Sequence, residues 1–337
     1  MWLDRLGQEN YRLETVYFGG GTPSLLSPGQ LARLVAAVTS SMPRAGAIEI
    51  SMEGNPDSLT LEGIRGYLDG GINRLSVGVQ SFDDASLRRL GRLHTAAEAE
   101  ATVACARAAG VSNLSLDLMY GLPGGSGSQE LRSLERAIQL GVEHISWYNL
   151  TLADTTELGR SVTDGSEVMP DEDEVLATMR EGWKMLAAAG YVHYELSNFA
   201  LPGFECRHNM GYWQYCDYVG LGLGASGCLQ GQRWTNVSQM DAFTAAVQEG
   251  ILPTDTTESL SKRRREGEYA MLRMRLPVIG LELGAFHELF GEDALTVFGE
   301  SLTELEQENL IVVGSDAIVC TQRGLELNNL VAEALIA

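Results

Sequence analysis

Through the first two thirds of the sequence, short runs rich in β-branched and aromatic residues alternate with helical patterns. Five of these runs predict strands: Thr15–Phe18, Ala47–Ser51, Arg74–Val79, Asn113–Leu118 and Glu143–Tyr148. Between the first two, Ser27 and Gln30 match a capping box with Pro28 at the first helical position. Because strand and helix recur in this order, the sequence predicts an α/β fold with a parallel sheet, either a barrel or an open doubly wound sheet.

Polar and glycine-rich segments close or directly follow these predicted strands. They are Gly19–Pro23, Glu53–Pro56, Gln80–Ser81, Asp117 with Tyr120–Pro123, and Asn149. Functional residues at the carboxyl ends of successive parallel strands are typical of a barrel, although an open sheet also places its ligands there. No G-K-[ST] follows the triple glycine, so a P-loop is unsupported.

The pattern changes after residue 170. An acidic start at Asp171–Glu174 opens a helix, and residues 191–240 are dense in Tyr, Trp, His and Gly, which indicates either a ligand-facing segment or a core corner with tight turns. Helices and then a predicted hairpin, Asn309–Val313 with Ala317–Cys320, follow and indicate a winged-helix-like module. We expect three parts: a barrel core over 1–170, the barrel end with the aromatic segment over 171–250, and the C-terminal module over 251–337.

Charge limits the partners of this chain. With 24 basic and 45 acidic residues the net charge is −21, which opposes contact with nucleic acid. Residues 251–337 carry seven basic and fifteen acidic side chains, so a packing or lid role is favoured there over DNA binding. We expect neither a signal peptide nor a membrane span; peripheral association with a membrane and a dimer are left open.

The five cysteines, at positions 105, 206, 216, 228 and 320, are widely scattered. This spacing supports neither a disulfide framework nor a zinc ribbon, and a cytoplasmic location is expected.

Three polar side chains at equivalent strand ends, Glu53, Gln80 and Asp117, favour a shared site, although each alone is compatible with a cap or a surface residue. Arg92 is suited to pairing with a ligand carboxylate, or to an exposed helix end.

Five segments in order carry a family resemblance: YFGGGTPSLL, EGNPDSLT, GINRLSVGVQSFDDASLRRLGRLHT, LSLDLMYGLPGG and YELSNFALPGFECRHNMGYW. They closely resemble the HemN/HemW branch of the radical S-adenosylmethionine (SAM) family, from about Thr15 to the C-terminus. The resemblance implies a partial (β/α)6 barrel of the TIM type with a small helical, winged-helix-like C-terminal domain. By the family motif, the SAM-binding residues would be Gly20, Gly21, Thr22, Glu53, Gln80, Arg92 and Asp117.

Within that branch, the H-N-x-x-Y-W segment resembles the haem chaperones more than the oxygen-independent coproporphyrinogen III oxidases. Its residues His208, Asn209, Tyr212 and Trp213 would bind haem, with His208 as axial ligand, and the partners would be haem and haem-accepting proteins. A histidine among aromatic residues also suits a purely structural role. Cys206 is either a second ligand or a small buried residue.

The sequence departs from the family in two places. The family holds a [4Fe–4S] cluster on C-x-x-x-C-x-x-C upstream of the triple glycine, and no such motif occurs here, so we expect no metal ligands in this chain and no oxidase activity. The barrel would lack its first strand, through truncation or through degeneration of a cluster-less homologue. In addition, Ser226 stands where family members often carry histidine.

Overall fold

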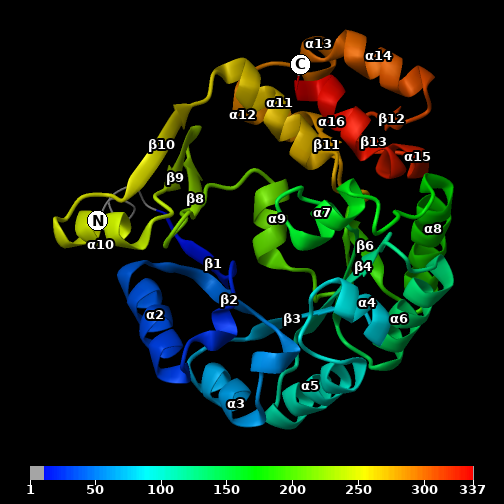
Figure 1. Ribbon diagram of the computed structural model, residues 1–337. Coiled ribbons are helices and arrows are strands. Elements are labelled where there is room, and N and C mark those ends of the chain that lie inside the picture. Colours follow the sequence, from blue (N-terminus) through cyan, green and yellow to red (C-terminus); the bar gives the residue numbers. More distant parts are fainter. Residues whose placement is uncertain (1–10, 337) are drawn as a thin grey trace. The chain divides into compact units, whose positions relative to one another are not determined.

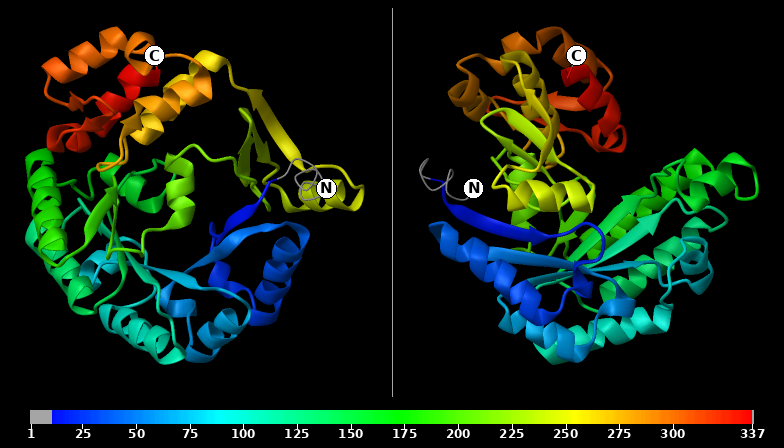
Figure 2. Two further views of the ribbon diagram at one scale, coloured as in Figure 1. Left: turned by 180° about the vertical axis from the view of Figure 1, so that it is seen from behind. Right: turned by 60° about the vertical axis from the view of Figure 1, so that its left-hand side comes forward.

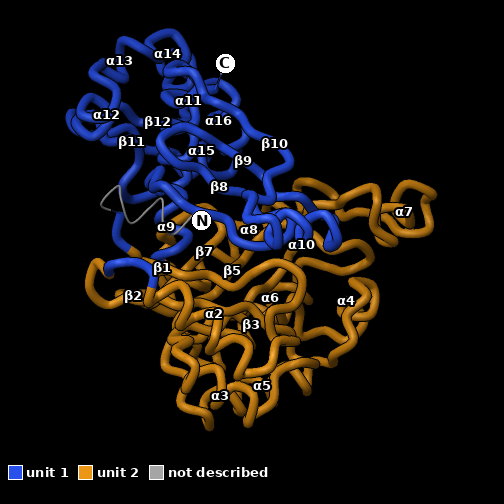
Figure 3. The backbone as a smooth tube through the Cα atoms, turned by 90° about the vertical axis from the view of Figure 1, so that its left-hand side faces the viewer, with its two compact units in different colours: residues 1–12, 41–43, 207–337 blue, residues 13–40, 44–206 orange. Residues whose placement is uncertain are grey.

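The computed structural model describes residues 11–336, which fall into two compact units (Figure 3). The barrel unit comprises residues 13–40 and 44–206. The C-terminal unit comprises the described residues of 1–12, 41–43 and 207–337. The chain passes from the first to the second between Cys206 and Arg207. The three-part division expected from the sequence stays a prediction.

The barrel unit is built on a curled seven-stranded sheet with the order β1-β2-β3-β4-β5-β7-β6 (Figure 1). Its strands are β1 (Leu13–Phe18), β2 (Arg44–Gly54), β3 (Arg74–Gln80), β4 (Leu114–Tyr120), β5 (His144–Asn149), β6 (Val192–Glu195) and β7 (Asn198–Ala200). The first five pair in parallel, and β7 pairs antiparallel with both β5 and β6. The five predicted strands and the partial barrel are therefore confirmed, and the sheet ends in an antiparallel hairpin.

Helices cover the outer face of this sheet (Figure 2). They are α2 (Pro28–Ser41), α3 (Leu61–Asp69), α4 (Asp84–Arg89), α5 (Ala96–Ala109), α6 (Gly127–Gln139) and α8 (Glu172–Ala188), with short 3-10 turns η1 (Pro23–Leu25) and η2 (Pro56–Ser58). The barrel unit also contains α7 (Glu157–Thr163), which projects away from the sheet (Figure 3). The predicted capping box is present, since the Gln30 N–H donates to Ser27 Oγ and the Ser27 N–H to Gln30 Oε1. Asp171 caps α8, whose first turn is acidic as expected.

The two faces of the sheet differ in chemistry. Outward-facing residues of β2 to β5 are apolar and fully buried, including Met52, Val77, Leu116 and Trp147. The alternate positions carry polar groups. They are Glu49, Ser51 and Glu53 on β2, Arg74, Ser76 and Gln80 on β3, Ser115 and Asp117 on β4, and His144, Ser146 and Tyr148 on β5. Because side chains alternate across a strand, these polar groups share the inner face. The interior is thus a polar cavity wall, in contrast to the branched apolar layers of most TIM barrels.

The C-terminal unit holds two small antiparallel sheets and eight helices within the described residues. One sheet has the order β10-β9-β8 and the other β11-β13-β12. The strands are β8 (Ser226–Leu229), β9 (Gln232–Asn236), β10 (Thr254–Ser259), β11 (Leu281–Glu282), β12 (Ile311–Val313) and β13 (Ala317–Cys320). The helices are α9 (Arg207–Trp213), α10 (Met240–Gln248), α11 (Lys262–Arg273), α12 (Leu283–Phe290), α13 (Ala294–Val297), α14 (Gly299–Gln307), α15 (Gln322–Glu326) and α16 (Asn328–Ile336).

The predicted hairpin is β12 with β13, which follows a helical run, so the winged-helix-like arrangement is confirmed. Over residues 11–336, none of the helices has the length and apolar character needed to cross a membrane.

Candidate functional site

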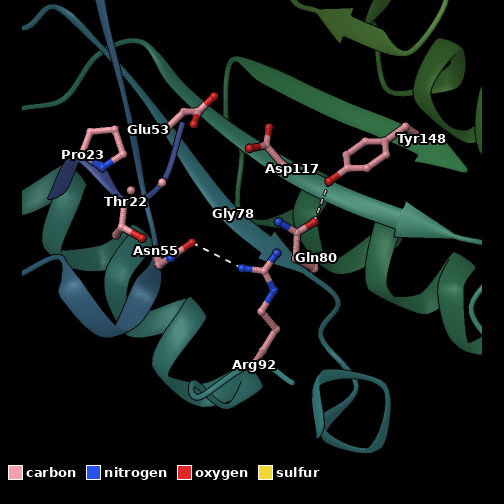
Figure 4. A pocket seen from close by; sticks show the side chains of 11 residues that line it. Thr22, Pro23, Glu53, Asn55, Gly78, Gln80, Arg92, Asp117 and Tyr148 are labelled. Carbon is pink, nitrogen blue, oxygen red and sulfur yellow. Dashed lines mark hydrogen bonds between the residues drawn. The ribbon is translucent and has the colours of Figure 1, made fainter. Parts of the chain in front are cut away.

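A pocket opens at the carboxyl ends of the barrel strands, and it gathers most of the residues that the resemblance singled out (Figure 4). Six of the seven predicted SAM contacts line it, and the seventh, Gly20, adjoins it through a bond to Glu53. The lining residues are Gly21, Thr22, Pro23, Glu53, Gly54, Asn55, Gly78, Gln80, Arg92, Asp117 and Tyr148. Asn55 belongs to the segment Glu53–Pro56, which was expected at a strand end, whereas Gly78 and Tyr148 were not anticipated from the sequence. The parallel sheet brings these residues together because most of them lie at, or just beyond, the carboxyl end of a strand. Asp117 lies within β4, and Arg92 follows α4.

The glycine loop and Glu53 form one wall of this pocket. Gly20 and Gly21 have φ of 78° and 64°, the left-handed region in which glycine carries no steric penalty. Glu53 accepts a hydrogen bond from the Tyr17 hydroxyl at 2.7 Å and another from the Gly20 N–H at 3.2 Å. Burial, followed by the nearby Glu53 carboxylate, raises the pKa of Tyr17, so its hydroxyl stays protonated as a donor. Glu53 is therefore fixed to the loop as an anionic wall.

Asp117 forms the floor; it lies at the centre of β4 and not at the strand end expected from the sequence. Its Oδ1 accepts from Ser146 Oγ at 2.7 Å and from Ser76 Oγ at 3.1 Å, hydroxyls on the two neighbouring strands. Burial raises the pKa of Asp117, while the Ser146 hydroxyl and the Arg74 guanidinium act to lower it. Both serines also lie on the inner face, so the alternating pattern of β3 and β5 orients this carboxylate.

Gln80 and Tyr148 form the opposite wall. Gln80 has φ 67°, and the pairing of β3 with β4 is irregular just before it, which turns its side chain into the pocket. The Tyr148 hydroxyl donates to Gln80 Oε1 at 2.8 Å. Burial raises the pKa of Tyr148, which keeps that proton in place. With its oxygen engaged by Tyr148, Gln80 presents its amide nitrogen as the donor to a ligand.

The absence of a side chain at Gly78 keeps a cradle open beside this amide. A Cβ there would lie 3.0 Å from Gln80 Nε2 and 3.1 Å from Asn55 Oδ1. The cationic side of the pocket is Arg92, whose Nη1 donates to Asn55 Oδ1 at 3.5 Å. The pocket thus has two carboxylates, one guanidinium, one oriented amide and a glycine-rich approach for a ligand backbone.

A second polar layer lies deeper inside the barrel and was missed in the sequence. Arg74 is 2% exposed, and although burial lowers its pKa, the neighbouring Cys206, Tyr194 and Glu49 raise it overall. The Cys206 thiol donates to Glu49 Oε1 at 3.6 Å, and its backbone N–H to the Tyr194 hydroxyl. The thiol of Cys206 is fully buried, as expected of a small core residue.

His144 belongs to the same layer. Its Nδ1 lies 2.7 Å from Ser115 Oγ and its Nε2 lies 2.8 Å from the Tyr194 hydroxyl. Burial, and then the positive charge of Arg74, hold the pKa of His144 well below its usual range, so the imidazole is neutral. The neutral His144 therefore adds no second positive charge beside the buried Arg74 guanidinium.

The H-N-x-x-Y-W segment belongs to the C-terminal unit, where it forms α9. His208 and Tyr212 are one turn apart on the same helix face: His208 Nε2 lies 3.0 Å from the Tyr212 hydroxyl, and the rings meet edge to face with centroids 4.9 Å apart. Trp213 lies on a different face together with Asn209. The guanidinium of Arg275 covers the Trp213 ring at 4.3 Å from its centroid.

The motif is therefore divided. Its His–Tyr face is partly exposed, and its Trp is covered by a cation from beyond α11. Ser226, the other departure from the family, lies on β8 with its hydroxyl 2.9 Å from Thr235 Oγ1.

Comparison with known proteins places these features in a family. The model of the radical SAM superfamily matches residues 1–137, and that of the HemN C-terminal domain matches residues 260–327. The heme chaperone HemW of Lactococcus lactis is 35% identical over 328 residues, which cover 96% of this chain and 85% of that protein. The chain belongs to the HemW family of radical SAM proteins.

Further relatives agree with this placement. HemW of Escherichia coli is 41% identical over 215 residues, covering 64% of this chain and 56% of that protein. The solved structure of the radical SAM enzyme HemN, a coproporphyrinogen III oxidase of E. coli, superimposes with a TM-score of 0.82 over 99% of this chain and 82% of that one, at 21% identity. This similarity shows a shared fold with HemN.

The radical SAM family implies SAM and a [4Fe–4S] cluster. The residues of the pocket fit SAM, because the Gly78 cradle, the glycine loop and the opposed charges suit an amino acid joined to a nucleoside. The residues present in this HemW-family chain do not fit the cluster. The sequence has no C-x-x-x-C-x-x-C, and over residues 11–336 no three His, Cys, Asp or Glu side chains converge in a metal-binding group.

Proposed function

We propose that this HemW-family protein is a haem carrier that binds SAM in the barrel pocket and haem at His208 of α9, and that it delivers haem to haemoproteins. The observation that carries the haem assignment is the partly exposed His208–Tyr212 face of a helix that has none of its seven residues buried. An imidazole beside aromatic rings suits axial ligation of a flat macrocycle. The relatives named heme chaperone support the same function.

The barrel pocket supports SAM binding through charge complementarity. SAM supplies a sulfonium, an ammonium, a carboxylate and ribose hydroxyls. Glu53 and Asp117 face the pocket as acceptors for cations and hydroxyls, and Arg92 provides a guanidinium for the carboxylate. The oriented amide of Gln80 adds a fixed donor. A fold shared with HemN is compatible with a carrier and with an oxidase, because fold alone does not decide function.

Ferric haem titrated into the purified protein tests the assignment. We expect a Soret spectrum with an axial-ligand signature that is lost in His208→Ala, together with haem transfer to apomyoglobin as a probe acceptor. The matched control is His287→Ala, which removes an exposed histidine of α12. Identical spectra and affinities for the wild type and His208→Ala would reject His208 as the ligand.

A further inference from the structure

The hydroxyl of Tyr212 contacts the imidazole nitrogen that is best placed to bind a haem iron. Nε2 is the ring nitrogen of His208 further from the helix backbone, so it is the one a wide macrocycle reaches with least obstruction. It lies 3.0 Å from the Tyr212 hydroxyl, within hydrogen-bond distance. In one tautomer the hydroxyl donates to the Nε2 lone pair, and in the other Nε2–H donates to the hydroxyl oxygen. In both, Nε2 is engaged.

The position of Tyr212 is fixed by its other neighbours. Its ring packs edge to face on Tyr218, with centroids 4.8 Å apart and planes at 88°. Tyr218 is itself held by a pair of backbone hydrogen bonds with Cys228, each 2.9 Å long. Tyr212 therefore lies between a fixed aromatic ring and His208, and its hydroxyl meets Nε2 without a rearrangement of α9.

We propose that Tyr212 is a release residue, whose hydroxyl competes with the haem iron for His208 Nε2. The inference rests on the proposed haem function and deepens it. When His208 binds haem, the Tyr212 O–H···Nε2 hydrogen bond breaks and the Nε2–iron bond forms. With the other ring nitrogen carrying the proton, no proton is lost, and the freed hydroxyl returns to water. When the haem is released, the same hydroxyl again donates a hydrogen bond to the Nε2 lone pair.

This competition gives a carrier a physical advantage. A hydrogen bond of this kind contributes about 0.5–1.5 kcal/mol net, so removing it should tighten haem binding by about two- to tenfold. A protein that hands its cargo to an acceptor needs binding that is weaker than the acceptor's. Tyr212 lowers the affinity for haem while His208 remains available as the ligand. Once the haem has left, the Tyr212 hydroxyl again provides a hydrogen-bond partner for His208 Nε2.

The test compares Tyr212→Phe with the wild type, since phenylalanine keeps the ring that packs on Tyr218 and removes the hydroxyl alone. We expect ferric haem to bind about two- to tenfold more tightly, with an unchanged His-ligated Soret spectrum and a correspondingly slower transfer to apomyoglobin. Tyr218→Phe is the matched control, because it removes a hydroxyl from the same ring cluster; its affinity and transfer rate should equal those of the wild type. Thermal melting checks folding, and Tyr212→Leu serves as a second hydroxyl-free variant whose side chain cannot bind iron.

The outcomes separate this inference from the function on which it rests. If His208→Ala binds haem as the wild type does, His208 is not the ligand, and the proposed competition by Tyr212 is rejected as well. If His208→Ala loses the axial signature but Tyr212→Phe and Tyr212→Leu bind haem as tightly as the wild type or more weakly, His208 remains the ligand and the competition is refuted. Weaker binding together with a changed spectrum would make Tyr212 a ligand.

Discussion

Single inner-face side chains give the barrel pocket its charge. Asp117 illustrates the physical conflict: burial favours its neutral form, while Ser146, Arg74 and Ser76 favour the carboxylate. Parts of this arrangement are predictable from sequence. Glu53, Gln80 and Asp117 are identifiable as polar residues that close apolar runs. Tyr148 is not, because within an aromatic run it resembles a core residue, and only pairing between distant strands reveals its hydrogen bond to Gln80.

Asp117→Asn should weaken SAM binding by about tenfold or more, because the substitution keeps the size of the side chain and removes the charge that a cation or hydroxyl of the ligand meets. Isothermal titration calorimetry with SAM measures the effect. Glu62→Gln, which removes an exposed carboxylate from α3, is the control and should leave the affinity unchanged. An Asp117→Asn affinity equal to that of the wild type would remove Asp117 from the site.

Gly78→Ala should reduce SAM affinity at least about tenfold with little loss of stability. The added methyl group would enter the cradle 3.0 Å from Gln80 Nε2, displacing the amide that a ligand meets. Calorimetry gives the affinity and thermal melting the stability. Gly29→Ala is the comparison, since a Cβ on that α2 glycine meets none of the described atoms within 4 Å. Equal SAM affinity in both variants would show that the ligand does not use the cradle.

At the scale of elements, the alternation of strand and helix patterns in the sequence predicts most of the barrel unit. The parallel strands followed from β-branched runs, and the capping box of Ser27 and Gln30 marked the start of α2. The β6–β7 hairpin, β8 and β9 were not predicted, because their strands are short and lie in an aromatic, glycine-rich segment. The strand β10 was not predicted because its residues, TDTTES, are polar and include no β-sheet pattern of alternating apolar residues. The two faces of α9 were also beyond sequence reasoning. Trp213 was expected beside a porphyrin, yet Arg275, 62 positions later, stacks on its ring.

The β6–β7 hairpin carries a histidine that should make stability depend on pH. His193 packs on Phe199 with ring centroids 4.2 Å apart, and burial lowers its pKa to about 4. The unfolded chain binds a proton near pH 6.5, while the folded chain does not. The contribution of His193 to the free energy of unfolding is therefore fully present above pH 6.5. It decreases by about 1.4 kcal/mol per pH unit as the pH falls towards 4.

His193→Gln removes that dependence. The variant should be less stable than the wild type at pH 7 through lost packing, and the difference should narrow by about 2 kcal/mol on going to pH 5. Urea unfolding at pH 7, 6 and 5 measures it. His287→Gln, at an exposed position, should keep a constant difference from the wild type. A constant difference for His193→Gln as well would mean that folding does not shift the pKa of His193.

For the whole molecule, the balance of charge is the dominant property, and it bears on the proposed cargo. The net charge of −21 argued against nucleic acid from the sequence alone. It has a second consequence for a haem carrier, because the two propionates of haem are negative. Long-range repulsion should slow the approach of haem to the protein, and salt should relieve that repulsion as the screening length shortens to about 10 Å at 0.1 M.

The rate of haem association should therefore rise with ionic strength, by about two- to tenfold between 20 and 200 mM salt. Stopped-flow absorbance in the Soret region, with monomeric ferric haem kept at low concentration, measures the rate. The dimethyl ester of haem lacks the propionate charges and should show almost no salt dependence, which separates screening from effects of salt on the protein. If the association rate of haem instead falls with added salt, haem approaches a positively charged surface, whose local field outweighs the net negative charge of the chain.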